Sequence, residues 1–519
     1  MNVNRHISVL VVDFGSQTTQ LIIRRVRELG VYSEIVSYKN ILQSVKKYRP
    51  KGVILSGGPS SAFKKKSPSI NKNLFFKGIP ILGICYGMQV ISQSLGGQVK
   101  ETNKREFGRA KIKILKKSNL LNKVTKVSGF SQVWMSHGDE VTSLPENFET
   151  IATTTGSNIT AIENKEKKIF GLQFHPEVVQ TLKGKQIFSN FIFNICNIKE
   201  QWKMENFLEN QIIKLKEKIA DKEVVCGLSG GVDSSVTAAL LSKAVGKKLT
   251  CIFVNHGMLR LNEEFEVIKA FKKHINGSLI YVNAKKTFLS KLKGVSNPET
   301  KRKIIGREFI KVFEREAKKR KYARYLAQGT LYPDVIESKK IEGSDAKVIK
   351  SHHNVGGLPK KLNLQLVEPL RELFKDEVRS LGYELKLPRE IVDRHPFPGP
   401  GLAIRIPGKV TQNKISILQK ADYIFISELH KNKLYKKIWQ AFCVLLPVKS
   451  VGVMGDSRSY EYTISVRAII SKDGMTADIY YFNRAFLKKL SNRIVGEVKG
   501  VNRVLFDITS KPPATIEWE

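Results

Sequence analysis

The sequence predicts an α/β protein made of several domains, and three observations carry this prediction. Between residues 7 and 282, short apolar runs of strand length alternate with amphipathic helical patterns, which is typical of largely parallel sheets covered by helices. The 519 residues are enough for three or four domains of ordinary size. Hydrophobic residues make up 41% of the chain, which supplies apolar side chains for several cores and excludes a wholly disordered protein.

The first predicted unit covers residues 1–200. It opens with a buried strand at 7–13 and a helix at 17–29, in which Ile22, Val26 and Leu29 share one face and Gly30 ends the helix. Further strands are expected at 31–36, 52–55 and 80–84, followed by short strands from 109 to 174 and a closing helix at 184–198.

A second α/β unit is expected over residues 201–394. Its predicted elements are helices at 207–219, 233–243, 263–273 and 299–320, strands at 223–228, 249–255 and 279–282, and a long polar loop at 338–361. The stretch His-Pro-Phe-Pro-Gly-Pro-Gly at 395–401 breaks regular structure. It marks a third region, 395–519, with a helix at 414–432 and strands at 460–470 and 504–508.

Charge patterning limits the partners. A net charge of +41 would suit nucleic acid or an anionic membrane. The lysines are spread along the chain without the interleaved aromatic residues of a base-stacking surface, so a lysine-rich surface is favoured and a nucleic-acid partner is not expected. No apolar run reaches the roughly 18 residues of a membrane-spanning helix, so no membrane partner is expected either.

Cysteine usage and the N-terminus indicate the compartment. The five cysteines are scattered and never form a Cys-x-x-Cys pair, which argues against a disulfide framework and a structural zinc site. The N-terminal residues lack the pattern of a secretory signal. A cytoplasmic location is therefore expected.

A strand-to-helix turn carries the first candidate nucleophile. Cys85 lies in the sequence Gly-Ile-Cys-Tyr-Gly at 83–87, between the strand at 80–84 and an apolar helical run at 88–95. Glycines allow a sharp turn at this point, and the dipole of the following helix stabilises a thiolate at its N-terminus. A cysteine flanked by glycines is also common as buried packing, so this motif alone leaves both interpretations open.

Two further segments supply the partners that a nucleophilic thiol needs. His175 and Glu177 are two residues apart in Gly-Leu-Gln-Phe-His-Pro-Glu, so in extended chain they share one face, as for a carboxylate that orients a catalytic imidazole. After another strand, the sequence Ser-Gly-Gly-Pro at 56–59 allows backbone N–H groups to approach a ligand oxygen. The N–H groups of Gly58 and Tyr86 are predicted to form an oxyanion hole.

Together these residues resemble the class I glutamine amidotransferases over residues 7–198. The resemblance implies that Cys85 attacks the side-chain amide of glutamine, that His175 transfers the proton and that Glu177 orients His175. It also implies that Gln89 helps to hold the substrate. The products would be glutamate and ammonia, and an ammonia-consuming synthetase is expected downstream.

A loop rich in serine and glycine, Ser-Gly-Gly-Val-Asp-Ser-Ser at 229–235, joins a buried strand to an amphipathic helix. Its N–H groups, hydroxyls and helix N-terminus suit a polyphosphate, while the absence of a Walker lysine points away from γ-phosphoryl transfer. The loop resembles the pyrophosphate loop of the N-type ATP pyrophosphatases, which implies ATP as co-substrate and Mg²⁺ on its phosphates. The residues implied for ATP binding are Ser229, Gly230, Gly231, Val232, Asp233, Ser234 and Ser235.

Segments further along the chain narrow the family. They include Lys-Ser-His-His at 350–353, Phe-Pro-Gly-Pro-Gly-Leu-Ala-Ile-Arg at 397–405 and Lys-Pro-Pro-Ala-Thr-Ile-Glu-Trp-Glu at 511–519. With the two motifs above, in this order, the chain is identified as a member of the glutamine-hydrolysing GMP synthetases. The resemblance implies a homodimer with three parts: a flavodoxin-like glutaminase domain at 1–200, a Rossmann-like ATP pyrophosphatase domain at 201–394, and a small α+β C-terminal dimerisation domain at 395–519 that binds xanthosine monophosphate (XMP).

The same resemblance assigns the remaining site residues. Asp334 and Glu337 would face the adenylylation site and are candidates for contact with magnesium, and Lys350, His352 and His353 would close over the ATP. The residues implied for XMP are Arg302, Gln440, Lys511, Ile516 and Glu517. The implied reaction converts XMP, ATP and glutamine to GMP, AMP, pyrophosphate and glutamate.

The C-terminal residues are expected to be docked rather than frayed. Pro512 and Pro513 lower the entropy lost on ordering the tail, and Trp518 gains most when it is buried. The tail is therefore predicted to form one wall of the XMP pocket.

An alternative from another class is an RNA-modifying enzyme that uses the same ATP chemistry. The +41 charge and the serine–glycine loop support it, whereas such an enzyme has no need of Cys85, His175 and Glu177. Retention of tRNA at about 150 mM salt would discriminate between the two, because non-specific electrostatic binding weakens steeply with salt.

Overall fold

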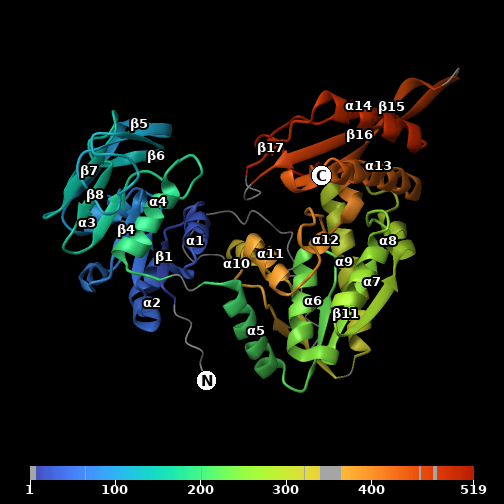
Figure 1. Cartoon of the computed structure of the whole chain (residues 1–519), viewed down its shortest axis with the longest axis horizontal. Coiled ribbons are helices and arrows are strands. Elements are labelled where there is room, and N and C mark those ends of the chain that lie inside the picture. Colours follow the sequence, from blue (N-terminus) through green and yellow to red (C-terminus); the bar gives the residue numbers. More distant parts are fainter. Residues whose placement is uncertain are drawn as a thin grey trace. The chain divides into compact units, whose positions relative to one another are not determined.

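The computed structural model describes residues 7–64, 66–199, 202–320, 322–338, 364–454, 457–471 and 476–519, with the side chains at 102–105, 336–338 and 454 excepted. The described residues divide into two compact units. Of the described residues, unit 1 holds those up to Lys203 together with Glu337 and Ser338, and unit 2 holds the others from Met204 onward. Figure 1 shows both units and labels some of their helices and strands.

Unit 1 is built on a mixed sheet of nine strands in the order β2-β1-β3-β4-β9-β8-β7-β5-β6. Its strands are β1 (Val9–Asp13), β2 (Ser33–Ser37), β3 (Gly52–Leu55), β4 (Ile81–Ile84), β5 (Gln98–Ile114), β6 (Phe130–Ser143), β7 (Glu149–Thr153), β8 (Ala161–Asn164) and β9 (Ile169–Leu172). Its helices are α1 (Thr19–Arg27), α2 (Ile41–Tyr48), α3 (Tyr86–Ser94) and α4 (Gly184–Ser189).

The parallel half of this sheet positions the first site. Strands β1, β2, β3, β4 and β9 run parallel, so their carboxyl ends meet at one edge. Every residue of β1, β3, β4 and β9 is buried, which explains why these strands are continuous apolar runs. The order 2-1-3-4 is that of flavodoxin-like folds.

The antiparallel half differs from the sequence-based expectation. Short strands were expected from 109 to 174, whereas β5 and β6 span 17 and 14 residues and pair as one long antiparallel ribbon. Only part of β6 is buried, so charged and polar residues interrupt the apolar pattern that would reveal its length. Strands β7 to β9 do match the expected short strands.

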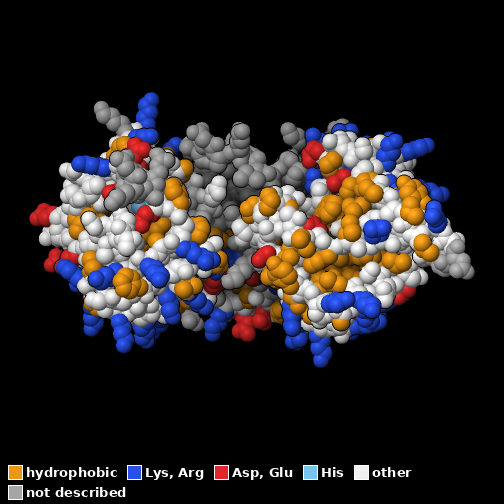
Figure 2. All heavy atoms as spheres, turned by 90° about the horizontal axis from the view of Figure 1, so that it is seen from above, with side chains coloured by type: hydrophobic (Ala, Val, Ile, Leu, Met, Phe, Trp, Pro, Cys, Tyr) orange, Lys and Arg blue, Asp and Glu red, His pale blue; other side chains and the backbone are white. Residues whose placement is uncertain are grey.

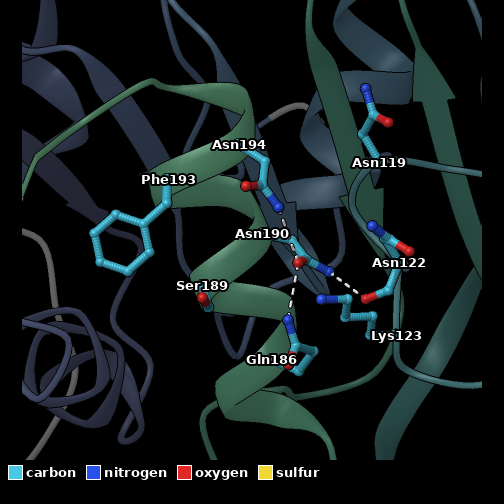
Figure 3. Close-up of a pocket in the computed structure, with 8 residues that line it drawn as sticks. All are labelled: Asn119, Asn122, Lys123, Gln186, Ser189, Asn190, Phe193 and Asn194. Carbon is cyan, nitrogen blue, oxygen red and sulfur yellow. Dashed lines mark hydrogen bonds between the residues drawn. The ribbon is translucent and has the colours of Figure 1, made fainter.

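The closing helix of unit 1 also departs from the expected single helix at 184–198. α4 ends at Ser189 and the chain continues as a π-helical segment, Asn190–Ile195. Asn190 stands at this junction, and its side-chain amide donates to the backbone oxygen of Leu120 at 2.9 Å. It also donates to the backbone oxygen of Asn122 at 2.7 Å (Figure 3). The amide oxygen accepts hydrogen bonds from Gln186 and Asn194, in the wall of a polar pocket of about 560 Å³.

Unit 2 contains a five-stranded sheet, a C-terminal sheet and the helices that cover them. The strands of the first sheet are β10 (Glu223–Gly227), β11 (Leu249–Asn255), β12 (Ser278–Asn283), β13 (Ala323–Ala327) and β14 (Gln365–Val367). The helices around it are α5 (Met204–Ile219), α6 (Val232–Val245), α7 (Glu263–His274), α8 (Lys285–Leu292), α9 (Pro298–Lys318), α10 (Tyr332–Ser338), α11 (Lys375–Glu384) and α12 (Arg389–Val392). The C-terminal elements are α13 (Gln412–Lys431), β15 (Gln440–Met454), β16 (Ser457–Ile470), β17 (Asp478–Ile479), α14 (Arg484–Glu497) and β18 (Val501–Phe506).

The topology of the five-stranded sheet positions the second site. All its pairings are parallel, and the strand order is β12-β11-β10-β13-β14. The chain moves from β10 through β11 to β12 and then returns to place β13 on the other side of β10. The carboxyl end of β10 is therefore a topological switch point, where open α/β sheets bind their ligands.

One hydrophobic core connects the two sheets of unit 2. It contains Val225 and Ile252 from the five-stranded sheet, Phe425 from α13, and Cys443 and Val466 from the C-terminal sheet. In the C-terminal sheet, β15 pairs with β16, and β18 runs parallel to β16 on its other side. The polar loop expected at 338–361 lies outside the described residues, apart from Ser338.

Candidate active sites

Cys85 occupies a strained turn between β4 and α3. Its backbone has φ +52° and ψ −106°, a conformation that residues with a side chain rarely adopt. A Cβ on Gly83 would lie 2.6 Å from the backbone carbon of Gly87, and a Cβ on Gly87 would collide with the carbonyl oxygen of Leu55. The two glycines are therefore required by the close approach of α3 to the sheet, and this approach fixes the direction in which Cys85 points.

The structure brings Cys85, His175 and Glu177 together. Nδ1 of His175 lies 2.7 Å from a carboxylate oxygen of Glu177, which is completely buried, and Cys85 is close enough to the imidazole to raise its pKa. The hydroxyl of Thr18 donates to the same Glu177 oxygen at 2.8 Å, and the hydroxyl of Thr181 donates to the backbone oxygen of His175 at 2.6 Å. These contacts hold the imidazole between the thiol and the carboxylate.

The charge state of His175 follows from these neighbours. Burial is the largest influence and lowers its pKa, but the charge of Glu177 and the hydrogen bonds to Cys85 and Glu177 together outweigh it and raise the pKa from 6.5 to about 11. At neutral pH the imidazole is thus protonated and lies beside the sulfur. An imidazolium in this position stabilises a thiolate, which is the reactive form of cysteine.

Gly58 and Tyr86, the predicted oxyanion-hole residues, are neighbours. A Cβ on Gly58 would lie 3.2 Å from the ring of Tyr86 and 3.1 Å from Phe14, so glycine is the residue that fits. Tyr86 is the first residue of α3, and the N–H groups of a first helical turn have no partner within the helix. Its phenol donates to the backbone oxygen of Pro68 at 2.6 Å, and burial raises its pKa to about 12.

Gln89 lies on α3 beside the nucleophile, and Gln173, which the sequence analysis missed, lies between them. The side-chain amide of Gln173 donates to the sulfur of Cys85 at 3.6 Å and is completely buried. Gln173 precedes His175 by two residues, so the alternation of an extended chain that paired His175 with Glu177 also predicts a shared face for Gln173.

The loop at 229–235 leaves β10 at the switch point. Gly230 has φ +80°, and Gly231 is the cap residue from which α6 starts. The hydroxyl of Ser234 lies 3.0 Å from that of Ser229 and accepts the Ser229 N–H at 3.2 Å, while the hydroxyl of Ser235 donates to the Gly231 oxygen at 2.9 Å. These serines fix a turn at the N-terminus of a 14-residue helix, an arrangement that suits a polyphosphate.

Two cations beside this loop were not predicted. The ammonium of Lys375, the first residue of α11, lies 2.7 Å from both carboxylate oxygens of Asp233. Arg394 donates to the backbone oxygen of Gly230 at 2.9 Å and pairs with Glu263 at 3.2 Å. Lys375 stands 142 residues beyond Asp233, so no local pattern connects the two.

The structure describes only some of the residues implied for the adenylylation site and its lid. The carboxylate of Asp334 accepts a hydrogen bond from the N–H of Leu331 at 3.0 Å and so stabilises the start of α10. Glu337 follows three residues later on the same helix, and its side chain lies outside the described part of the structure. Lys350, His352 and His353 lie outside the described residues. Within the described part of the chain, no group of three His, Cys, Asp or Glu side chains could hold a metal ion by itself.

Two residues implied for XMP meet around a buried arginine. The carboxylate of Glu517 accepts hydrogen bonds from Nε and Nη2 of Arg405 at 3.0 and 2.8 Å and from the amide of Gln440 at 2.6 Å. Arg405 is completely buried, and its guanidinium lies over the aromatic rings of Phe397 and Phe442. Arg405 was not predicted as a site residue, although it ends one of the motifs that identified the family.

The rest of the tail is docked by further cations. Arg467, completely buried, donates to the backbone oxygens of Thr515 and Ile516 at 3.0 and 2.9 Å. Lys301, also buried, contacts the carboxylate of Glu519. The tail is thus docked through polar contacts, but Trp518, which was expected to be buried, is 40% exposed and donates to the carboxylate of Asp507 at 2.9 Å. Lys511 forms paired backbone hydrogen bonds with Ala477 at 2.8 and 3.0 Å.

Arg302 lies apart from the Glu517 cluster in its contacts. Its guanidinium is 3.7 Å from the carboxylate of Glu299 in the first turns of α9, and the side chain is partly exposed. The neighbouring Lys301, on the same helix, contacts Glu519 of the tail.

Among the described residues, no helix is long and apolar enough to span a membrane.

Comparison with known proteins gives matches along the chain. The family model "Glutamine amidotransferase class-I" matches residues 10–195, "NAD synthase" matches 201–306 and "GMP synthase C terminal domain" matches 427–518. A glutamine amidotransferase of known structure from Thermotoga maritima is similar over 42% of this chain and 87% of its own, with 21% identity and a TM-score of 0.28.

Full-length relatives are also similar to this chain. A protein of Brachyspira hyodysenteriae named glutamine-hydrolyzing GMP synthase is 56% identical over 98% of this chain and 99% of its own length. Proteins with the same name from Phenylobacterium zucineum and Bartonella bacilliformis are each 55% identical, over 99% and 100% of this chain and 99% and 100% of their own lengths.

Proposed function

The chain belongs to the glutamine-hydrolyzing GMP synthases, and on that basis we propose which of its residues perform each step. The enzyme hydrolyses glutamine to ammonia and uses ATP to aminate XMP to GMP, with release of AMP and pyrophosphate. The observation that carries the assignment of residues is the contact of Cys85 with the buried His175–Glu177 pair.

In the glutaminase reaction, the thiolate of Cys85 attacks the amide carbon of glutamine. The N–H groups of Gly58 and Tyr86 stabilise the oxyanion that forms, and Gln89 holds the substrate. His175 gives its proton to the departing ammonia, which leaves a thioester on Cys85. His175 then takes a proton from the attacking water, and glutamate is released. Glu177 keeps the imidazole oriented throughout.

In the synthetase reaction, the loop Ser229–Ser235 binds the terminal phosphates of ATP through its N–H groups and the N-terminus of α6. An oxygen of XMP attacks the α-phosphorus, pyrophosphate leaves, and ammonia then displaces AMP from the adenylylated base. Lys375, held on Asp233, adds a positive charge beside the loop, where a Walker lysine is missing. When bound, Mg²⁺ would neutralise phosphate charge, with Asp334 and Glu337 as candidate ligands.

The tail and its surroundings are the proposed XMP site. Gln440, Ile516 and Glu517 lie in one network around Arg405 and Arg467, while Lys511 and Arg302 supply cations that suit the 5′-phosphate. By resemblance, Lys350, His352 and His353 close over the ATP.

The proposed domains are 1–200, 201–394 and 395–519. The last two share a hydrophobic core.

A homodimer is the proposed assembly. β15 is an edge strand, and its outer half exposes Val448, Val451 and Val453, with Tyr460 opposite Val451 on β16. Their exposed fractions are between 59% and 75%, and Figure 2 shows hydrophobic side chains gathered over this side of unit 2. An apolar edge strand invites pairing with a second copy. Analytical ultracentrifugation tests this surface by comparing the oligomeric state of Val451→Lys with that of the unaltered chain.

A cytoplasmic location is also proposed. All five cysteines are unpaired, which fits it.

The test of the residue assignment uses two nitrogen sources. Cys85→Ala should abolish GMP formation with glutamine and leave formation with ammonium nearly unchanged, because the nucleophile and the ATP loop lie in separate units. Reactions contain XMP, ATP and magnesium, and chromatography follows GMP, AMP and pyrophosphate. Equal loss with both nitrogen sources would contradict the assignment of Cys85, and ADP with inorganic phosphate as primary products would contradict that of the loop.

A further inference from the structure

A buried chain of hydrogen bonds starts at Cys85 and leads away from the catalytic pair. Gln173 donates to the Cys85 sulfur at 3.6 Å, and the amide of Gln89 lies 3.5 Å from the Gln173 side-chain oxygen. The same Gln89 amide donates to the backbone oxygen of Asp139 on β6 at 3.0 Å. Both N–H groups of Gln89 are therefore used, and its oxygen is the group that it can offer to a substrate.

The chain continues through His137, whose ring is buried. Its Nδ1 lies 3.1 Å from the same Asp139 oxygen, and its Nε2 lies 3.3 Å from the carboxylate of Glu106. Glu106 on β5 and His137 on β6 are directly opposite in the register of the ribbon, so their side chains share one face. Both ring nitrogens of His137 therefore face oxygen atoms, one from each of the two strands.

The carboxylate of Glu106 is in turn fixed by a loop after β7. The hydroxyl of Thr154 lies 3.0 and 3.3 Å from its two oxygens and accepts a hydrogen bond from the N–H of Ser157 at 2.9 Å. A Cβ on Gly156 would lie 2.5 Å from the Glu106 oxygen, so the loop leaves no space for the carboxylate to move toward it. The far end of the chain is thus anchored.

We propose that Glu106, His137 and Gln173 are positioning residues of the glutaminase reaction. They hold the segment 136–139 of β6 against the nucleophile, where the Ser136 backbone oxygen lies 3.7 Å from the Cys85 sulfur, and they fix the orientation of the Gln89 amide. Glu106 and His137 act through this segment without touching the reacting atoms, whereas Gln173 also contacts the sulfur itself. The inference rests on the proposed assignment of Cys85 as the nucleophile.

The experiment compares kinetics with glutamine and with ammonium for Glu106→Ala, Glu106→Gln and Gln173→Ala. Glu106→Ala should raise KM for glutamine and lower kcat/KM by between about ten- and a hundredfold, since it frees the segment that orients Gln89. Glu106→Gln keeps an oxygen that can accept from His137 and should recover most of the loss. Gln173→Ala should act mainly on kcat, because its amide contacts the sulfur itself. Synthesis from ammonium should stay within about twofold of the unaltered enzyme in all three.

A double variant and a matched control complete the test. If Glu106 and His137 act as one unit, the double variant Glu106→Ala with His137→Ala should lose no more kcat/KM for glutamine than the worse of the two single variants. Glu149→Gln on β7 of the same sheet breaks the exposed pair of Glu149 with Lys116 and should change neither activity. Unchanged glutamine kinetics in Glu106→Ala, additive losses in the double variant, or parallel loss of ammonium-dependent synthesis would overturn the inference. If Cys85→Ala kept glutamine-dependent activity, the assignment of the nucleophile would fail first.

Discussion

Replacing Glu517 by glutamine tests whether the tail is held by a buried ion pair. Both carboxylate oxygens of Glu517 accept hydrogen bonds, from two nitrogens of Arg405 and from the amide of Gln440. A glutamine side chain has one oxygen and one NH₂ group, so in any orientation an N–H would face another donor. The substitution Glu517→Gln therefore removes a charge and leaves a donor without its acceptor while changing the volume very little.

The expected cost follows from the burial of Arg405. The guanidinium is completely buried; burial alone lowers its pKa, and the charge and hydrogen bonds of Glu517 more than compensate and raise it. Without Glu517 the arginine stays charged and loses its main partner, and removal of one partner of a buried pair costs about 3–5 kcal/mol. With a melting-temperature change of about 2 °C per kcal/mol for a large unit, the transition of unit 2 should fall by about 6–10 °C.

Differential scanning calorimetry measures this shift, and Glu497→Gln is the matched control. Glu497 pairs with Arg493 one turn earlier on α14, where both side chains are partly exposed, so its loss should cost less than about 1 kcal/mol. A double variant, Arg405→Met with Glu517→Met, should recover much of the stability because no charge is left unpaired. Equal shifts for Glu517→Gln and Glu497→Gln would refute the view that burial makes the Arg405 pair important.

Three other predictions concern the two reactions. In Glu177→Gln, the charge that opposes the effect of burial is lost and the pKa of His175 should fall, so the alkaline limit of glutaminase activity should move to lower pH in a profile of kcat/KM for glutamine. Gly87→Ala should reduce glutaminase activity by roughly a hundredfold or more, because the added methyl collides with the Leu55 oxygen and displaces the Cys85 turn, while ammonium-dependent synthesis persists. Deletion of the residues after Ser510 should abolish GMP formation from either nitrogen source and spare basal glutaminase activity; near-normal XMP affinity in the truncated enzyme would contradict the proposed substrate site.

The sequence predicted the elements that are buried on all sides. β3 and β11 have the predicted bounds, because each is a fully buried apolar run between turn residues, and such a signal is local. The lengths of β5 and β6 were not predicted, since their pairing is set by contacts between distant residues and their exposed positions carry charges. The π-helical end of unit 1 depends on Asn190 reaching a loop about 70 residues earlier, which no helical periodicity records.

The same distinction applies to the candidate sites. Cys85, His175 and the Ser229–Ser235 loop stand in short motifs whose chemistry is set by adjacent residues. The contact of Gln173 with Cys85 joins positions 88 residues apart, and that of Arg405 with Glu517 joins positions 112 apart. Such pairs are created by the fold, so they become visible only when the sheet order and the path of the tail are known.

Because the tail completes the proposed XMP site, the order in which the ribosome makes the two ends of the chain affects how glutamine is used. The ribosome completes residues 1–203, which carry Cys85, His175 and Glu177, about 310 residues before it reaches Glu517. At about 5–20 residues per second, this interval lasts roughly 16–63 s. A message broken within it would yield a chain able to consume glutamine without an acceptor for the ammonia, so the wasted nitrogen of truncated products should scale with how often translation stops in the second half of the gene.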